Sequence, residues 1–331
     1  MNRLTINCQL STVNYTLVAP LNWGLGHAAR VIPIINRLIN EGAEVMIGGN
    51  GESLKFLRAE FPNLKYVELP GVNINYSSGK SQVWAVLRQL PSIIHYSIKE
   101  HKAIKDIVRR YNITEVISDN RFGLFGSGVR SVYITHQIMV KMPAWLKLLE
   151  PLGYRMHKRI IERYDECWIP DYAEAERSLA GDLTHKYPLP HNARFIGPLS
   201  RFTDMKDGCK PVDCDVLAIM SGVEPHRTLF EKSIAERYHG SKLKVILVRG
   251  KSGLVPSSID YGNIEVKGVL TASDLLPYIL GAKKIICRSG YTTVMDMHLL
   301  GKTNLEWSAT PGQTEQEYLL TQTNLQAHTK I

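Results

Sequence analysis

Cysteine is scarce in this 331-residue sequence, and the few thiols show no pairing pattern. They are scattered and odd in number, at Cys8, Cys167, Cys209, Cys214 and Cys287. None forms a CxxC pair with histidine partners, so the sequence indicates neither a disulfide framework nor a zinc site. This cysteine usage is typical of a reducing compartment.

Long apolar runs are missing as well. Residues 1–20 carry a single arginine and no apolar stretch of the length found in signal peptides. Nowhere does the chain reach the roughly 20 consecutive apolar residues that a membrane-spanning helix needs. We therefore expect a cytoplasmic protein that does not cross a membrane.

Acidic residues are outnumbered by basic ones. The chain has 31 Asp and Glu against 40 Lys and Arg, which gives a formal net charge of +9. Such an excess favours a polyanionic partner: nucleic acid, an anionic membrane surface or a phosphorylated substrate. No DNA- or RNA-binding module is recognisable, and aromatic residues do not alternate with basic ones as a base-stacking surface requires. We expect no nucleic-acid partner.

The sequence is rich, in contrast, in short β-branched runs that alternate with helix-length segments. The expected strands cover residues 16–20, 43–48, 65–69, 114–118, 131–135, 166–170 and 193–197, and then 215–220, 244–249, 283–288 and 303–307. Apolar strands separated by helices indicate parallel sheets covered on both faces. The polar, aperiodic segment 201–214 is typical of an interdomain linker. The prediction is an α/β fold of two doubly wound, Rossmann-like domains facing a cleft, over residues 14–200 and 201–331.

A glycine-rich turn follows the first expected strand. In residues 22–30 (NWGLGHAAR), Gly24 and Gly26 permit a tight turn, and a helix is expected from about His27. Backbone amides at a helix N-terminus favour an anion such as a phosphate. The same spacing fits a plain strand-to-helix turn with His27 as an ordinary helix residue, so both interpretations stay open.

The second half repeats this arrangement. Ser221–Gly222 precede one expected helix, and Ser289–Gly290 precede another that carries Asp296. A Pro-Gly turn then precedes a helix whose first residues, 313–317, are polar. A capping box explains part of this last start without any ligand. It does not explain the repetition of glycine turns followed by polar helix starts.

These motifs resemble those of GT-B glycosyltransferases of family 28, the group that includes the peptidoglycan N-acetylglucosaminyltransferase acting on lipid I. The resemblance covers nearly the whole chain and is strongest near its end. Residues 24–27 (GLGH) resemble the family's first glycine loop, which ends in a histidine at the catalytic cleft. Residues 287–296 (CRSGYTTVMD) resemble its donor-site turn and helix.

The resemblance implies roles for individual residues. Asp296 would contact the ribose hydroxyls, and Gln316 with Glu317 would hold the transferred sugar. The diphosphate would lie at Ser221–Gly222. The implied donor site as a whole comprises Gly24, Gly26, Arg201, Ser221, Gly222, Leu270, Ser289, Gly290, Thr293, Asp296, Gln313, Gln316 and Glu317. Asp296 and Glu317 replace a Glu and a Gln of the family pattern, which leaves the donor sugar open.

The implied reaction is an inverting transfer from a nucleotide sugar, with UDP as the expected carrier, to a lipid-linked or saccharide acceptor. Helix N-termini and a basic side chain would stabilise the leaving diphosphate, so we expect neither a metal nor another cofactor. His27, or a carboxylate across the cleft, would be the general base. Asp119 and His136 follow strands of the first domain and are further catalytic candidates. Their alternatives are a turn cap and a structural hydrogen bond.

One triplet matches the metal-binding signature of another glycosyltransferase fold. Asp213 and Asp215 flank Cys214 in a DxD pattern. The triplet lies at the start of an expected strand, whereas ligands of such sheets bind beyond the strands' carboxyl ends. We therefore expect no metal at this position.

A basic amphipathic stretch stands in the middle of the chain. Residues 141–163 (KMPAWLKLLEPLGYRMHKRIIER) combine Trp145 and several leucines with six Lys and Arg. Such a stretch can lie on an anionic membrane surface. We expect that partner, with peripheral association at the inner face of the plasma membrane. The alternative is a pair of helices that cover the sheet and expose a solvated basic face.

Two other functions fit the same architecture. One is a nucleotide-sugar hydrolase like those of pseudaminic-acid synthesis, which activate water with a similar Gly-His loop. The other is a non-catalytic nucleotide-sugar binder. The basic stretch favours transfer, because a hydrolase needs no acceptor platform.

Overall fold

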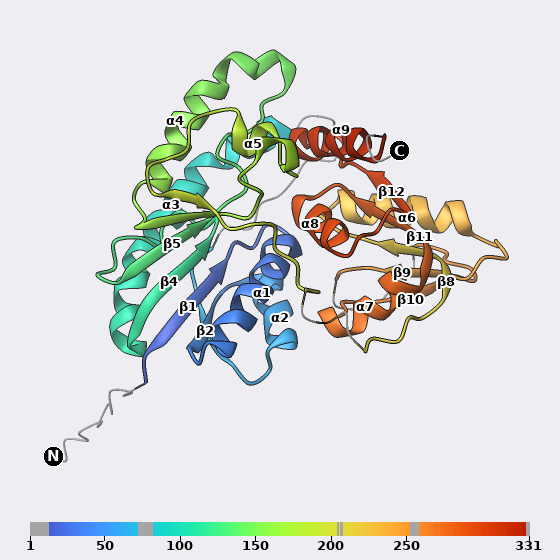
Figure 1. Cartoon of the computed structure of the whole chain (residues 1–331), viewed down its shortest axis with the longest axis horizontal. Coiled ribbons are helices and arrows are strands. Elements are labelled where there is room, and N and C mark those ends of the chain that lie inside the picture. The colour runs from blue at the N-terminus through green and yellow to red at the C-terminus, as the bar shows by residue number, and fades with distance from the viewer. Residues whose placement is uncertain (1–12, 72–81, 204, 206–207, 252–257, 329–331) are drawn as a thin grey trace.

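Two parallel sheets form the framework of the molecule (Figure 1). The computed structural model describes residues 13–71, 82–203, 205, 208–251 and 258–328. The first sheet has seven strands in the order β3-β2-β1-β4-β5-β6-β7, and the second has five in the order β10-β9-β8-β11-β12. Helices connect most strands, as parallel pairing requires. These are the two Rossmann-like domains that the sequence predicts, and the fold class is confirmed.

The first domain contains the following elements. They are β1 (Tyr15–Pro20), α1 (Leu25–Asn40), β2 (Glu44–Gly49), α2 (Gly51–Glu60), β3 (Lys65–Glu68), α3 (Gln82–Tyr111), β4 (Ile113–Asp119), β5 (Arg130–Ile134), the 3-10 helix η1 (Ala144–Leu149), α4 (Glu150–Ile161), β6 (Glu166–Ile169), η2 (Ala175–Arg177), α5 (Asp182–His185) and β7 (Ala193–Phe195).

The second domain follows the same plan. Its elements are β8 (Cys214–Ile219), α6 (His226–Tyr238), β9 (Val245–Val248), β10 (Glu265–Lys267), α7 (Ala272–Gly281), β11 (Ala282–Arg288), α8 (Tyr291–Leu299), β12 (Leu305–Ser308) and α9 (Thr314–His328). Strand β10 was not expected from the sequence, because three residues are too few to show a periodic pattern.

Both sheets reverse their strand order beside their first strand. β1 lies between β2 and β4, and β8 lies between β9 and β11. In α/β sheets, ligands bind outside the carboxyl ends of the strands at such switch points. Register decides which residues meet there: Pro20 is paired with Asp119, and Ile219 with Cys287. The turn after β1 therefore stands beside Asp119, and the turn after β8 stands beside the end of β11.

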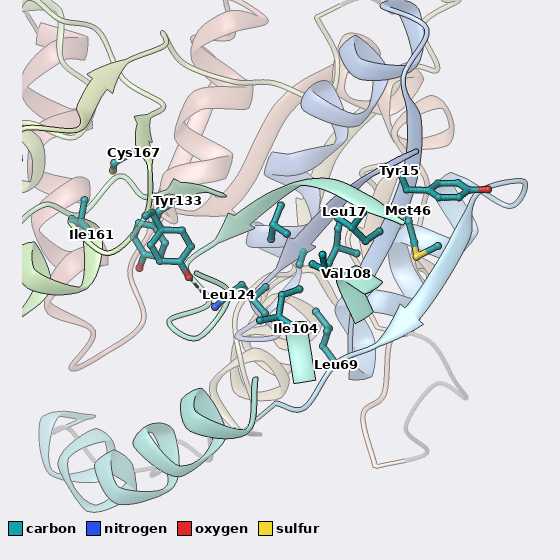
Figure 2. Close-up of a cluster of buried hydrophobic side chains, with 14 of the residues drawn as sticks. Tyr15, Leu17, Met46, Leu69, Ile104, Val108, Leu124, Tyr133, Ile161 and Cys167 are labelled. Atoms are coloured by element: carbon teal, nitrogen blue, oxygen red, sulfur yellow. Dashed lines mark hydrogen bonds between the residues drawn. The ribbon is translucent and has the colours of Figure 1, made fainter. Parts of the chain in front are cut away.

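Apolar clusters cover both faces of the first sheet, because successive side chains of a strand point to opposite faces. Leu17 belongs to a cluster with Ile104 and Val108 of α3, which Figure 2 shows. Its neighbour Val18 belongs to another cluster with Ile32 of α1. The second sheet is covered in the same way. Burial on both faces explains why the strands are apolar throughout.

A fifth apolar cluster joins the two domains. It includes Met139 and Leu183 from the first domain and Tyr291, Val294 and Leu319 from the second. Figure 1 shows α9, in red, lying close to α5 of the first domain. Among the helices of the described residues, none combines the length and the apolarity needed to cross a bilayer.

Candidate active site at the domain junction

His27 and Asp119 meet at the switch point of the first sheet. His27 lies in the first turn of α1, and Asp119 is the last residue of β4. The Nδ1 atom of His27 is 2.7 Å from Oδ1 of Asp119. The Asp119 side chain is completely buried, whereas 16% of the His27 side chain is exposed. A buried carboxylate thus orients an imidazole that solvent or a ligand can reach.

Arg30 contacts the same carboxylate. Its Nε donates to Oδ2 of Asp119 over 2.7 Å, and a terminal nitrogen donates to Oδ1 over 2.5 Å. This is the bidentate geometry of strong arginine–carboxylate pairs. Burial would raise the pKa of Asp119, but Arg30 and His27 outweigh burial and lower that pKa to about 2. Asp119 is therefore ionised at neutral pH. Sequence reasoning missed Arg30, although its spacing of three from His27 places both on one helix face.

The hydrogen-bond network assigns the proton on neutral His27. Nδ1 has two neighbours, an Asp119 oxygen at 2.7 Å that only accepts and an Arg30 nitrogen at 3.0 Å that only donates and already bonds Asp119. The shorter contact to the anion decides the tautomer, so Nδ1 carries the hydrogen that points to Asp119. Nε2 then keeps its lone pair. An imidazole in this tautomer can take a proton from a hydroxyl group that reaches it.

His136, just beyond β5, is the third catalytic candidate and lies in the same network. Its Nδ1 atom is 2.6 Å from a terminal nitrogen of Arg30. Since a guanidinium only donates, this Nδ1 is an acceptor and the hydrogen of neutral His136 is on Nε2. Burial lowers the pKa of His136, and the Arg30 charge lowers it further, although Glu315 opposes both effects. We therefore assign a neutral ring to His136.

Glu315, from the first turn of α9, brings the second domain into the network. Its Oε1 atom is 2.7 Å from Nε2 of His136, and its Oε2 accepts a hydrogen bond from the side chain of Gln137. Burial would raise the pKa of Glu315, but His136 and the charge of Arg30 lower it. Sequence reasoning did not select Glu315, because 179 residues separate it from His136 and no local pattern links them.

Two helix starts of the second domain lie against the first glycine loop. The hydroxyl of Thr292, in the first turn of α8, donates to the carbonyl of Gly26 over 3.1 Å. A Cβ atom at Gly24 would lie 4.0 Å from Val223, in the turn before α6. The predicted anion-binding turns after β1, β8 and β11 therefore converge at one place.

A buried arginine occupies the switch point of the second sheet. Arg288 ends β11, is 3% exposed, and donates to the carbonyl of His226 over 2.7 Å and to the hydroxyl of Thr310. Burial lowers its pKa to about 10, with Arg227 as a second cause. In the described part of the chain no carboxylate pairs with Arg288, and its Nε has no hydrogen-bond partner. A positive charge without an acidic neighbour is thus held in the turn region of the second domain.

The predicted ribose ligand Asp296 is engaged within the protein. Its carboxylate is 2% exposed and accepts a hydrogen bond of 2.7 Å from the Ser200 hydroxyl. Nε of Arg201 lies 3.4 Å away. Burial raises the pKa of Asp296, while Arg201 and Ser200 oppose this effect. Because the side chain is buried, a ribose could reach this carboxylate only after the residues that cover it move.

The predicted sugar ligands stabilise a turn. Oε1 of Gln316 accepts from the backbone N–H of Thr310 over 2.9 Å, and Oε1 of Glu317 accepts from the N–H of Gly312 over 2.8 Å. Both bonds fix the turn between β12 and α9. Their role toward a sugar stays a prediction.

The other expected donor residues lie along the carboxyl edge of the second sheet. They follow β8 (Ser221, Gly222), β10 (Leu270), β11 (Ser289, Gly290, Thr293) and β12 (Gln313). The hydroxyl of Ser289 donates to the carbonyl of Gln316 over 2.8 Å, which ties the turns after β11 and β12 together. The structure thus gathers these residues at one edge.

The DxD triplet lies at the opposite edge of that sheet. Asp215 is the second residue of β8 and accepts from the Lys283 ammonium and from the backbone N–H of Lys244, each over 2.8 Å. Across the described ranges no group of three or more His, Cys, Asp or Glu side chains is arranged to bind a metal ion. Metal independence of the reaction stays a prediction.

Several proteins similar to this chain are described as enzymes that transfer or modify sugars. No protein-family model matches the chain. An uncharacterized glycosyltransferase of Methanosarcina acetivorans is 22% identical over 313 residues, which cover 89% of this chain and 79% of that protein. Among solved structures, the glycotransferase of kitacinnamycin has a TM-score of 0.53 at 11% identity and covers 93% of this chain and 84% of its own. A putative UDP-N-acetylglucosamine 2-epimerase from Listeria monocytogenes has a TM-score of 0.51 at 12% identity, with coverages of 96% and 89%.

These likenesses show the two-domain GT-B arrangement of this chain. Identities this low carry the fold and not the substrate, because one fold supports many functions. The resemblance to family 28 stays a prediction.

Proposed function

We propose that this protein is an inverting glycosyltransferase that moves a sugar from a nucleotide donor, with UDP as the carrier, to an acceptor hydroxyl. The observation that carries the proposal is the His27–Asp119 pair, which stands where the helix starts of both domains converge. The M. acetivorans relative, described as a glycosyltransferase, supports the reaction class. The family resemblance supports UDP.

In the proposed reaction, Nε2 of His27 takes the proton of the acceptor hydroxyl. The acceptor oxygen forms a bond to the anomeric carbon as the bond from that carbon to the diphosphate oxygen breaks. Asp119 stays ionised, since its pKa is about 2, and it stabilises the imidazolium that forms. A preorganised partner of this kind needs no rearrangement during the reaction.

Negative charge develops on the leaving diphosphate. We propose that it is stabilised by the N-termini of α6 and α8 together with Arg288. Arg288 suits this role because its charge is buried without an acidic partner, and a Cβ atom at Gly222 would lie 3.1 Å from its guanidinium. An anion at this turn would neutralise the charge that burial makes costly.

The donor and the base can be tested separately. We would titrate the protein with UDP-, GDP-, TDP- and CMP-sugars by calorimetry and measure turnover with lipid and glycan acceptors. His27→Ala should lower turnover by about 100-fold or more and leave donor affinity nearly unchanged. Arg288→Met should weaken donor binding by about tenfold or more.

Two exposed positions supply matched controls. His191→Ala and Arg237→Met each remove a surface side chain that pairs with a glutamate, and both should behave as wild type. No binding of any nucleotide sugar by the folded protein would overturn the proposed function.

The products distinguish the competing activities of this fold. A transferase yields nucleoside diphosphate only when an acceptor is present, whereas a hydrolase releases free sugar steadily without one. An epimerase would interconvert the donor sugar, and a plain binder would leave it intact. Free sugar at the rate of nucleotide release, with every acceptor tested, would replace the transferase proposal with the hydrolase alternative.

We also propose that the acceptor is lipid-linked and that η1 and α4 rest on an anionic membrane. Several large apolar side chains of this segment are exposed: Trp145, Leu148, Leu149, Leu152 and Met156. Leu148 is 95% exposed, and an exposed group of large apolar side chains is more informative than a single one, because such patches mark interaction surfaces. Lys147, Arg155 and Arg159 are exposed on the same two elements. Apolar side chains rimmed by basic ones match an anionic bilayer surface.

Flotation with vesicles measures this association. The protein should float with vesicles containing anionic phosphatidylglycerol and not with pure phosphatidylcholine. Leu148→Glu should abolish flotation, because it places a negative charge against the lipid. Leu229→Glu is the control, since Leu229 is 53% exposed on α6 of the other domain. Equal flotation of both variants would overturn the membrane proposal.

A further inference from the structure

Arg30 makes more contacts in the candidate active site than its pairing with Asp119 requires. One terminal nitrogen lies 3.0 Å from Nδ1 of His27, and the other lies 2.6 Å from Nδ1 of His136. The side chain is 1% exposed, so water does not share these contacts. A guanidinium has donors only, and therefore a ring nitrogen that accepts from it carries no hydrogen, and a carboxylate that accepts from it is ionised.

Three neighbours are restricted at once. Asp119 is kept ionised, with both oxygens engaged. Nδ1 of His27 donates to Asp119, so its 3.0 Å contact with Arg30 holds that edge of the ring against the ion pair without a hydrogen bond. Nδ1 of His136 must accept, so its Nε2–H must point toward Glu315.

The last of these contacts crosses to the second domain. Glu315 lies in α9 and accepts from both His136 and Gln137. The ring of His136 also stacks on Tyr291, the first residue of α8, with ring centres 4.3 Å apart and planes at 5°. The tautomer of His136 is thus selected by Arg30 on one side and by Glu315 of α9 on the other, and Tyr291 of α8 fixes the plane of the ring.

We propose that Arg30 and His136 are positioning residues that make His27 competent as a base only while α9 is docked on the first domain. This inference rests on the proposed function, since it takes His27 as the base. Without Glu315, His136 can carry its hydrogen on Nδ1. That hydrogen would then face an N–H of Arg30, and the two groups would repel each other. The guanidinium would then shift and leave the Asp119 carboxylate uncompensated beside His27, which favours the protonated, inactive imidazole.

The groups that face this network come from several elements. They are His27 and Arg30 of α1, Asp119 of β4, His136 after β5, Tyr291 of α8 and Glu315 of α9. Any pH dependence of catalysis by His27 therefore reflects all six groups. The three tests below distinguish the contributions of Arg30, His136 and Glu315.

The first test determines the tautomers directly in the wild-type protein. Protein labelled with ¹⁵N-histidine is examined by two-bond ¹H–¹⁵N correlation at pH 7, with His27→Gln and His136→Gln spectra as assignments. We expect the hydrogen of His27 on Nδ1 and that of His136 on Nε2. A hydrogen on Nδ1 of His136 would overturn the inference. This test does not need activity, so it decides the network even if the proposed function fails.

The second test separates positioning from donor binding. Glu315→Ala should lower kcat by about 10- to 100-fold and change the donor Kd by less than about twofold, because misorientation of a base affects the chemical step. The control is Glu236→Ala, which removes a surface carboxylate of α6. If the affinity for the nucleotide sugar fell by the same factor as kcat, Glu315 would be a residue that binds the nucleotide sugar. That result would overturn the proposed dependence of His27 on α9.

The third test separates the charge of Arg30 from its geometry. Arg30→Met should move the acid limb of the kcat profile to higher pH by about one unit, because the Asp119 carboxylate is left uncompensated. Arg30→Lys keeps the charge and loses the bidentate geometry, so it should lower kcat without moving the limb. An unshifted limb in a folded Met variant would overturn the inference. If that variant does not fold, wild-type kcat in Arg30→Lys would overturn it instead.

Discussion

At the scale of single residues, charge compensation distinguishes the two halves of the site. Asp119 in the first domain has Arg30 as a buried counter-ion, and its pKa is lowered to about 2. Arg288 in the second domain has no acidic partner among the described residues, and its pKa is lowered to about 10. One half is thus electrostatically complete before a substrate binds, and the other is completed by an anion.

The lowered pKa of Asp119 predicts an acid-dependent loss of stability. The group's ordinary pKa is 3.8, so its contribution is complete above about pH 4 and is lost as the pH falls toward 2. The contribution is about 2 kcal/mol, because one pKa unit corresponds to about 1.4 kcal/mol. Urea unfolding at pH 5, 4 and 3 should show the free energy of unfolding falling more steeply in wild type than in Asp119→Asn. Asp106→Asn, which removes an exposed carboxylate, is the control for the loss of one acidic side chain.

Gly222 provides a test of the anion site at the same scale. Its φ is +93°, and a Cβ atom there would lie 3.1 Å from the Arg288 guanidinium. Gly222→Ala should weaken binding of the nucleotide sugar by about tenfold. An alanine at this positive φ adds backbone strain of roughly 1 kcal/mol or more, and its Cβ atom displaces the Arg288 guanidinium. Gly240→Ala is the matched control, with φ +67° and open space around the added atom. Equal donor affinity in the two variants, measured by calorimetry, would contradict the assignment of the site.

At the scale of elements, the turn between β12 and α9 combines a structural role with a proposed role in sugar binding. Gln316 uses its side-chain oxygen to accept from the Thr310 N–H, and the family resemblance gives it the transferred sugar. One lone pair of this oxygen bonds the backbone, so we assign the turn to the oxygen and the ligand to the NH₂ group, whose two hydrogens a sugar oxygen can accept. The structural and functional tasks therefore belong to different atoms of one side chain.

Two substitutions at Gln316 separate those tasks. Gln316→Glu keeps an acceptor for Thr310 and removes the NH₂ donor, so it should retain thermal stability and weaken donor binding. Gln316→Ala should also lower the free energy of unfolding by about 1 kcal/mol, since the buried Thr310 N–H loses its partner. Denaturant unfolding and calorimetry check the two effects. Unchanged donor affinity in both variants would assign Gln316 to the turn alone.

At the scale of the whole molecule, the domains share a core as well as a site. The cluster around Met139, Tyr291 and Leu319 contains buried side chains from both domains. The N–H of Asp182 in α5 donates to the hydroxyl of Tyr318 over 2.8 Å, so α9 is also bound to the first domain by a hydrogen bond. Domains joined by a shared apolar cluster unfold together when that cluster is essential to both.

Leu319 tests this cooperativity. Leu319→Ala should lower the free energy of unfolding by about 3 kcal/mol, because it leaves a cavity in the shared cluster. Calorimetry should show one transition for wild type and a single, lower transition for the variant. Leu229→Ala, on the exposed face of α6, should change little. Two separate transitions in wild type would show that the domains unfold independently.

Much of this framework could be predicted from the sequence alone. The alternation of apolar runs and helices predicted two doubly wound domains, and eleven expected strands correspond to observed ones within one or two residues. Glycine turns at Gly24, Ser221 and Ser289 marked the edges where sites form. These are local signals, because strand length, helix starts and tight turns depend on neighbouring residues.

What the tertiary structure alone decided is which of these residues meet. The register of β1 with β4 puts Asp119 beside His27, and the docking of α9 puts Glu315 beside His136. The same packing encloses Asp296 under Ser200 and leaves Arg288 without an acidic partner. Residues far apart in the sequence are brought together by sheet order and domain packing, which carry no local pattern. The sequence by itself therefore determined the edges where chemistry takes place, and only the fold selected the groups that perform it.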